Sequence, residues 1–157
     1  APVDKDLTVS TVTSTIADGK AYSFYMSGFY NTAGKTVEGF VVEDPLPAQD
    51  YNVAYVRFVN AISNSSAMTL YAKNTTTLAE VPVGAAVAYK GAGAFTSVPV
   101  AVYDLGARVA GATANAISRT AVSFVAGRVY TIGARGDITI TSTTATNRPF
   151  LDNTANR

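Results

Sequence analysis

Turn-forming residues interrupt this chain so often that only short elements fit between them. Gly, Asn, Asp and Pro cluster at close intervals, as in Asp18-Gly19, Asn31 to Gly34, Asp44 to Pro47 and Gly136-Asp137. The segments between the clusters are rich in Val, Thr and Tyr, which pack well on a pleated, half-buried surface. We therefore expect an all-β protein, an antiparallel β-sandwich of about 9 to 11 short strands.

The alternation of apolar and polar residues gives the approximate position of each strand. The expected strands lie near residues 7–16, 21–30, 36–43, 53–60, 67–73, 78–82, 86–90, 95–103, 119–125, 128–135 and 137–143. One segment, from Ala107, could be helical, but Gly111 interrupts it and it lacks a clean apolar stripe. Pro99 cannot donate to a ladder and predicts an edge strand or a bulge. The alternating valines between residues 98 and 102 are expected to face the core.

The composition argues against several function classes. Hydrophobic residues make up 48% of the 157-residue chain, charged residues 15%, and the net charge is +1, which argues against disorder and against a nucleic-acid surface. Cys, His and Trp do not occur, so thiol nucleophiles, imidazole bases and disulfides are missing. No apolar run approaches the roughly 20 residues that span a bilayer. We expect no enzymatic activity, no cofactor, no nucleic-acid partner and no membrane span.

Carboxylates are the remaining acid-base groups, and most of them fall at turns or strand ends, where Asp commonly caps its own backbone. A glycosidase would need two carboxylates facing one cleft. Glu43-Asp44 with Asp50, or Asp137 with Asp152, could supply oxygen ligands to calcium, but no spaced loop motif supports such a site. The sequence therefore predicts neither catalytic nor metal-binding residues.

One strand pattern occurs twice in the chain, 108 positions apart. The segment "ADGKAYSFYMSG", which starts at Ala17, matches "VAGRVYTIGARG", which starts at Val125, and the ungapped match runs from residue 9 to residue 44, placing Asp44 on Asp152. We therefore divide the chain into an N-terminal half repeat, residues 1–52, and a complete unit, residues 53–157. Together they are expected to form one compact structural unit.

The faces of the two copies differ. Tyr22, Phe24 and Met26 form an apolar row that recurs in the second copy, so in both copies this row is expected to face a core. The opposite face of the second copy carries Thr, Gly and Arg, which suit water, whereas the first copy carries Tyr25 and continues to Phe29. A strand with aromatic residues on both sides is normally covered on both sides. We therefore expect Tyr25 and Phe29 to make a second contact.

Four segments in order resemble the exported bacterial "domain of unknown function 4397" family. They are "AYVRFVNAISNSSAMTLYA", "LAEVPVGAAVAYK", "FTSVPVAVYD" and "VSFVAGRVYTIGARG". The family pattern runs from a VR-[FV]-V-[NH]-A strand to an A-G-x-x-Y-T strand that ends in Gly. The resemblance implies an immunoglobulin-like or transthyretin-like β-sandwich outside the cell, and it supplies no established catalytic residues.

The half repeat suggests a role in assembly, because its strands lack the first half of the sandwich that would cover them. They could fold onto the complete unit, or pair with a neighbouring subunit by strand addition. The segment "LTVSTVTSTI", residues 7–16, is the expected donor strand, through Leu7, Val9, Val12 and Ile16. We therefore expect an extracellular or cell-surface structural protein, after signal-peptide removal, that joins copies of itself into a filament or surface layer.

Two other hypotheses stay open. Nine Tyr residues supply flat amphipathic surfaces, which would also suit a cell-surface adhesin or a carbohydrate-binding module whose partners are glycans or other surface proteins. Alternatively, the chain is one piece of a longer multi-repeat surface protein.

Overall fold

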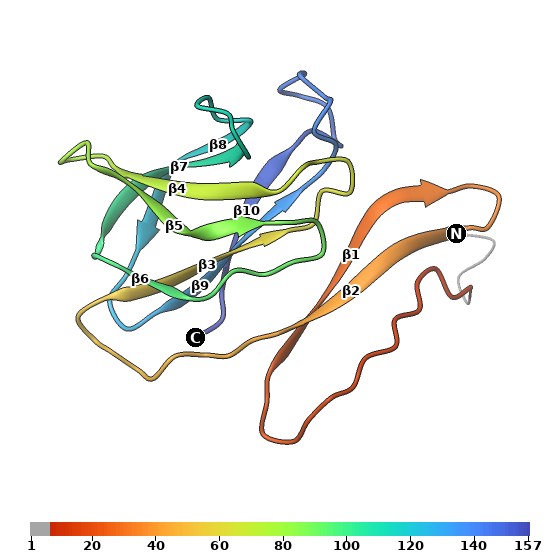
Figure 1. Ribbon diagram of the computed structural model, residues 1–157, viewed down its shortest axis with the longest axis horizontal. Coiled ribbons are helices and arrows are strands. Elements are labelled where there is room, and N and C mark those ends of the chain that lie inside the picture. Colours follow the sequence, from red (N-terminus) through yellow and green to blue (C-terminus); the bar gives the residue numbers. More distant parts are fainter. Residues whose placement is uncertain (1–6) are drawn as a thin grey trace.

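A computed structural model describes residues 7–157, and its regular secondary structure consists of strands (Figure 1). They are β1 (Tyr22–Asn31), β2 (Thr36–Glu43), β3 (Ala54–Asn60), β4 (Met68–Asn74), β5 (Glu80–Val87), β6 (Thr96–Val98), β7 (Ala101–Val109), β8 (Ile117–Phe124), β9 (Val129–Arg135) and β10 (Phe150–Ala155). No helix occurs within residues 7–157. The expected all-β class and the number of strands are confirmed.

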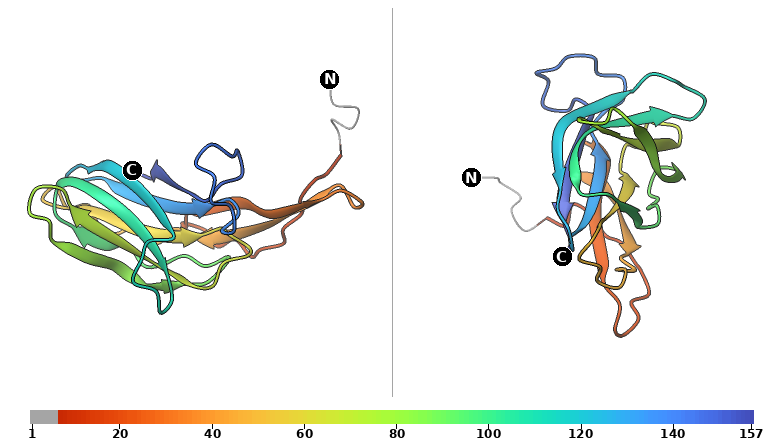
Figure 2. Two further views of the ribbon diagram at one scale, coloured as in Figure 1. Left: turned by 90° about the horizontal axis from the view of Figure 1, so that it is seen from above. Right: turned by 90° about the vertical axis from the view of Figure 1, so that its left-hand side faces the viewer.

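Two four-stranded sheets pack on each other, and β1 and β2 form a separate hairpin. One sheet, here the β3 sheet, has the order β10-β9-β3-β6, and the other, the β4 sheet, has the order β5-β4-β7-β8. All paired neighbours are antiparallel except β3 and β9, which run parallel. The hairpin projects beyond one end of the sandwich as a narrow extension (Figure 2). The sandwich is confirmed, and one parallel pair departs from the antiparallel expectation.

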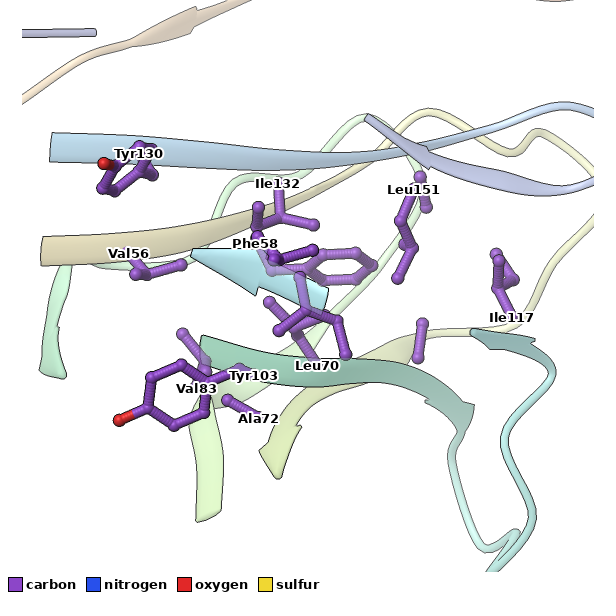
Figure 3. Packing of buried hydrophobic residues seen from close by; sticks show 14 of the residues in the cluster. Val56, Phe58, Leu70, Ala72, Val83, Tyr103, Ile117, Tyr130, Ile132 and Leu151 are labelled. Carbon is purple, nitrogen blue, oxygen red and sulfur yellow. The ribbon is translucent and has the colours of Figure 1, made fainter. Parts of the chain in front are cut away.

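The main core fills the space between the two sheets (Figure 3). On β3, Val56 and Phe58 are fully buried in it, and Ile132 of β9 joins them. Leu70 of β4 packs into the same cluster from the opposite sheet. Because side chains alternate along a strand, Arg57 points to the other face of the β3 sheet.

The chain crosses from one sheet to the other at Pro99. β6 ends at Val98 in the β3 sheet, and β7 begins at Ala101 in the β4 sheet. Val98 is buried, but Val102 is 41% exposed, and Tyr103 faces the core and donates its hydroxyl to the Pro99 carbonyl (2.8 Å). The expected core face is therefore wrong beyond Val98, because the crossing reverses which residues point inward. Pro99 directly follows β6, an edge strand of the β3 sheet, so of the two expectations for Pro99, an edge strand or a bulge, the edge strand is confirmed.

Several expected elements differ in position. The expected strands 78–82 and 86–90 both overlap the single strand β5, an edge strand that tolerates Pro82 because one side of its backbone has no strand partner among the described residues. The segment from Ala107 continues strand β7 and is not helical. Residues 137–143 form no strand, and neither do residues 7–16. β10 was not expected, because its sequence FLDNTA is poor in strand formers. The strand forms because Leu151 is buried in the core and because its backbone pairs with β9.

Candidate assembly interface

The turns that begin β1 and β9 are alike in detail. Gly19 and Gly127 both adopt the left-handed conformation, with φ of 73° and 74°, which Gly does without steric cost. The Ala17 amide donates to the Tyr22 hydroxyl (3.1 Å), and 108 positions later the Val125 amide donates to the Tyr130 hydroxyl (3.2 Å). The repeat seen in the sequence is therefore present in the structure.

The second strands of the two hairpins match with a different offset. Asp44 accepts a hydrogen bond from Ser23 (2.7 Å), and Asn156 accepts one from Thr131 (2.7 Å). Their backbone amides also make equivalent bonds, to the carbonyls of residues 21 and 129, both at 2.7 Å. The counterpart of Asp44 is thus Asn156. The ungapped match to Asp152 is wrong, because Tyr130 and its partner Ala155 are four positions further apart in the sequence than Tyr22 and its partner Glu43.

Arg57 ties the hairpin to the sandwich. Its side chain is fully buried, donates from Nε to the Thr131 hydroxyl (3.0 Å) and from Nη1 to the Glu43 carbonyl (3.0 Å), and forms an ion pair with buried Asp44. The Phe95 ring lies 4.7 Å from the guanidinium carbon. A buried charge is tolerated when it is paired and hydrogen-bonded, so these contacts fix where the hairpin sits. The sequence alone placed Asp44 among the carboxylates at turns and strand ends and did not indicate this contact.

Tyr25 makes its contact within the chain. Its ring stacks on Phe40 of β2 at 5.1 Å between centroids, in a small cluster with Val42, Val59 and Ala61 that joins the hairpin to the β3 sheet. Burial raises the pKa of the Tyr25 hydroxyl above its usual value. The second contact expected of Tyr25 is therefore intramolecular.

A hydrogen-bonded network joins the hairpin to the chain just after β5. Ser27 shares a hydrogen bond with the Tyr89 hydroxyl (2.8 Å), and the same hydroxyl donates to Glu38 (2.8 Å). Lys90 pairs with Glu38 at 2.9 Å. The hydrogen bonds from Lys90 and Tyr89 lower the pKa of the Glu38 carboxyl. These contacts hold the middle of the hairpin against the sandwich.

The outward face of the hairpin is apolar and open. Phe24 is 54% exposed and Met26 57%, whereas their counterparts in β9, Ile132 and Ala134, are fully buried. The expectation that Phe24 and Met26 face a core is wrong, because the β4 sheet that covers β9 has no counterpart over β1. On the face of β9 that was expected to meet water, Thr131 is buried and bonded to Arg57, whereas Arg135 is exposed, so that expectation is wrong at Thr131 only.

Residues 7–16 lie along the hairpin without becoming a strand. In the ungapped alignment they correspond to the chain up to the end of β8, which pairs with β7, and the half repeat contains no counterpart of β7. Within the described chain, one backbone hydrogen bond joins this segment to β2, from the Val37 amide to the Val9 carbonyl (2.8 Å). Ser10 and Val12 pack over Gly39, where an added Cβ would come within 2.8 Å of each. Ser10 Oγ is buried without a hydrogen-bond partner.

The predicted joining residues have different surroundings. Leu7 is 44% exposed, Val9 39% and Ile16 61%, whereas Val12 is half-buried on Gly39. Phe29 is 59% exposed. Leu7, Val9, Ile16 and Phe29 therefore leave apolar surface in water.

A groove runs between β1 and the β3 sheet. β1 pairs with β2 along one edge, and its other edge has no strand partner among the described residues. Two hollows of about 310 and 190 Å³ lie between β1 and the chain of β9 and β10, and both are lined by Met26, Ala61 and Arg135. Phe29 lines the smaller hollow, and Asp152, ion-paired with Arg135, lines the larger. We call this feature the β1 groove; sequence reasoning missed it, because it depends on how the hairpin is docked.

The carboxylates weighed as calcium ligands have other partners. Glu43 pairs with Lys20 (2.8 Å), Asp44 with Arg57 and Asp152 with Arg135. Within residues 7–157 no group of three or more acidic, His or Cys side chains is placed to hold a metal ion. In the same part of the chain, no helix has the length and apolar character to cross a membrane.

Comparison with known proteins adds no relative. No protein-family model matches the chain, and no curated protein matches it either. The resemblance to the "domain of unknown function 4397" pattern therefore stays a prediction, and the argument for function depends on the geometry of the half repeat.

Proposed function

We propose that this is a non-enzymatic extracellular structural protein, a building block of a filament or surface layer whose subunits join by β-strand addition. One observation supports this above all: within the described residues the half repeat has an edge of β1 without a strand partner, and it also has a segment, residues 7–16, that forms no strand and keeps one backbone hydrogen bond to β2. An edge with free amides and carbonyls is a template for another strand. A segment that leaves one copy to add to the next makes a head-to-tail contact, which need not close.

In the complete unit, the strand that matches β1 has both a second neighbouring strand and a covering sheet. β9 has a strand on each edge and is covered by the β4 sheet, so Ile132 is fully buried. The matching strand β1 lacks the second neighbour and the cover, and Phe24 is half exposed in consequence. Apolar area of this kind is stabilised by removal from water. Association at the half repeat would supply both missing contacts.

Deleting residues 1–16 tests the proposal. We expect the intact protein to form larger particles as its concentration rises, and the deleted form to stay monomeric, by sedimentation velocity and electron microscopy. A deletion of residues 1–6, which keeps 7–16, is the matched control and should still assemble. An intact protein that remains monomeric at high concentration would overturn the proposed function.

Glycan binding, the alternative function, has less support from the tyrosines. Tyr25 stacks inside the hairpin contact, and Tyr103 and Tyr130 are buried. Tyr30 at 56% and Tyr51 at 73% keep the most exposed rings. Saturable binding on a glycan array that is lost in Tyr51→Ala would favour the adhesin or carbohydrate-binding alternative.

A further inference from the structure

The second copy of the repeat provides a template for what the edge of β1 accepts. β9 pairs with β10 on one edge and, on the other, with β3 in parallel, from Tyr55 opposite Val129 to Asn60 opposite Ala134. β1 matches β9, and β2 matches β10 through the equivalent bonds of Asp44 and Asn156. The free edge of β1 therefore corresponds to the edge of β9 that β3 occupies. A strand added there would run parallel to β1.

The β1 groove offers a suitable surface for the side chains on one face of such a strand. Its two hollows adjoin Tyr25 to Phe29 of β1, and the β9 and β10 side is polar, with the Arg135 and Asp152 ion pair half exposed. Met26, which lines both hollows, and Phe24, two residues before it, are exposed apolar residues of β1. The surface thus suits a strand with small polar residues on one face and apolar residues on the other.

Residues 7–16 have the properties of that strand. The segment has ten residues, as β1 does, and is uncharged and rich in Thr and Val, which favour strands. In its own subunit it keeps one backbone hydrogen bond to the hairpin and buries Ser10 Oγ without a partner, so its placement there leaves hydrogen-bonding capacity unused. Thr8 and Ser10 alternate with Leu7 and Val9, which gives the polar and apolar faces that the groove requires.

We propose that residues 7–16 of a second copy add to the free edge of β1 as a parallel strand and fill the β1 groove. This inference rests on the proposed function and specifies its acceptor, its donor and its polarity. In the second copy, β3 pairs with Val129 to Ala134 of β9. The same register in the first copy, 108 positions earlier, places the added strand opposite Ala21 to Met26. Thr8 and Ser10 then face Arg135 and Asp152, and Leu7 and Val9 lie beside the exposed Phe24.

Disulfide trapping tests the site and the polarity, because the natural chain has no Cys. Single-cysteine variants are prepared separately, mixed in pairs and oxidised, and the mixed dimers are counted by mass spectrometry. We expect a parallel strand to cross-link Val9→Cys with Phe24→Cys, and Thr15→Cys with Phe29→Cys. The exchanged pairings, Val9→Cys with Phe29→Cys and Thr15→Cys with Phe24→Cys, report an antiparallel strand. Thr36→Cys reports addition to β2.

The outcomes separate this inference from the proposed function. Assembly with the exchanged pairings, or with cross-links to Thr36→Cys, would overturn the parallel β1 site and leave strand addition in place. Assembly without any cross-link from the 7–16 segment, together with binding of a synthetic peptide of residues 54–60 to the protein, would show that a strand other than residues 7–16 occupies the edge of β1. That outcome would also overturn the inference. A wild-type protein that never assembles would overturn both.

Two substitutions test the same site without cysteine. Met26→Lys places a charge where the incoming strand would exclude water, and we expect association to weaken about tenfold or more. Val102→Lys, at a similarly exposed valine on the β4 sheet, is the control and should leave association unchanged. Unchanged association in Met26→Lys would contradict the proposed site.

An added Cβ at Gly39 would come within 2.8 Å of Ser10 and Val12 and 3.0 Å of the Phe24 ring, so Gly39→Ala should displace residues 7–16 from their own hairpin, with a smaller adjustment of Phe24. We expect assembly to begin at a concentration several-fold lower. Gly93→Ala, where an added Cβ meets ordinary contacts, is the control and should not change that concentration. Unchanged or weaker assembly in Gly39→Ala would contradict the exchange of this segment.

Discussion

The hairpins β1–β2 and β9–β10 have the same local bonds and opposite environments. Tyr22 and Tyr130 accept equivalent amide bonds, and Asp44 and Asn156 accept equivalent hydroxyl bonds. In one hairpin, however, the apolar row is the core of a sandwich, and in the other it is open to water. The comparison shows that the local sequence determines the turn and the strands, whereas burial depends on which other strands are present to cover them.

The largest difference is expected at Arg57, which joins the two copies. Arg57→Met should lower the free energy of unfolding by about 3–5 kcal/mol, because it leaves the Asp44 carboxylate buried without its partner. Urea unfolding followed by circular dichroism measures the change. Arg135→Met is the control, since its ion pair with Asp152 is about half exposed, and should cost no more than about 1 kcal/mol. Equal losses in the two variants would show that burial of Arg57 has no energetic consequence.

The second test compares the matched apolar positions. Ile132→Ala should cost about 2–5 kcal/mol, because it leaves a cavity in the main core. Phe24→Ala, at the corresponding position of β1, should cost less than about 1 kcal/mol in the monomer, since that ring is half exposed. Thermal and urea unfolding at low concentration give both values. A loss at Phe24 as large as that at Ile132 would mean that the hairpin face is covered.

A smaller difference is expected at the matched tyrosine hydroxyls. Tyr130→Phe should cost about 1 kcal/mol, because the Val125 amide loses its acceptor beside a buried ring. Tyr22→Phe removes the same bond where the Ala17 amide is exposed to water, and the loss should be a fraction of that. Unfolding curves of the two variants provide the comparison. A larger loss in Tyr22→Phe would contradict the assignment of β1 as the more open copy.

The smallest effect concerns pH and the docking of the hairpin. Lys90 and Tyr89 lower the pKa of Glu38 below its ordinary value of 4.5, so the folded state binds this proton less readily than the unfolded state. The stabilisation is present above about pH 4.5 and is lost as the pH falls through the lowered pKa. Glu38→Gln should therefore flatten the slope of stability against pH below about pH 4.5. Near pH 7 to 8, where the carboxyl is ionised in both states, the slope should be the same in the two proteins. An identical acid slope in both proteins would show that the contact is not formed in solution.

Much of the fold could be predicted because its determinants are local. Turn residues and alternation indicated β3, β4 and β9, and Pro99 indicated an edge strand or a bulge at its position. Alternation alone could not show that the faces reverse after Pro99, since the reversal depends on the chain entering the other sheet. Nor could it show β10, whose polar sequence is held in place by β9.

The candidate interface was predictable only in part. The repeat indicated an incomplete half unit and the expected joining residues, and the structure places most of them on exposed surface. The roles of Arg57 and Asp44 could not be predicted, because 13 positions in the sequence separate two groups that meet only when the hairpin folds back over β3. The same docking creates the β1 groove, which no single segment encodes.

Arg57 also has a mechanical consequence. The hairpin connects to the rest of the protein through the covalent segment between β2 and β3, the buried contacts of this guanidinium, the cluster of Tyr25 and Phe40, and the hydrogen bonds of Tyr89. If subunits join through the half repeat, tension along the assembly enters each molecule at the hairpin. Arg57 lies between that point and the main core, so its bonds would resist the hairpin being peeled away before the sandwich bears the force.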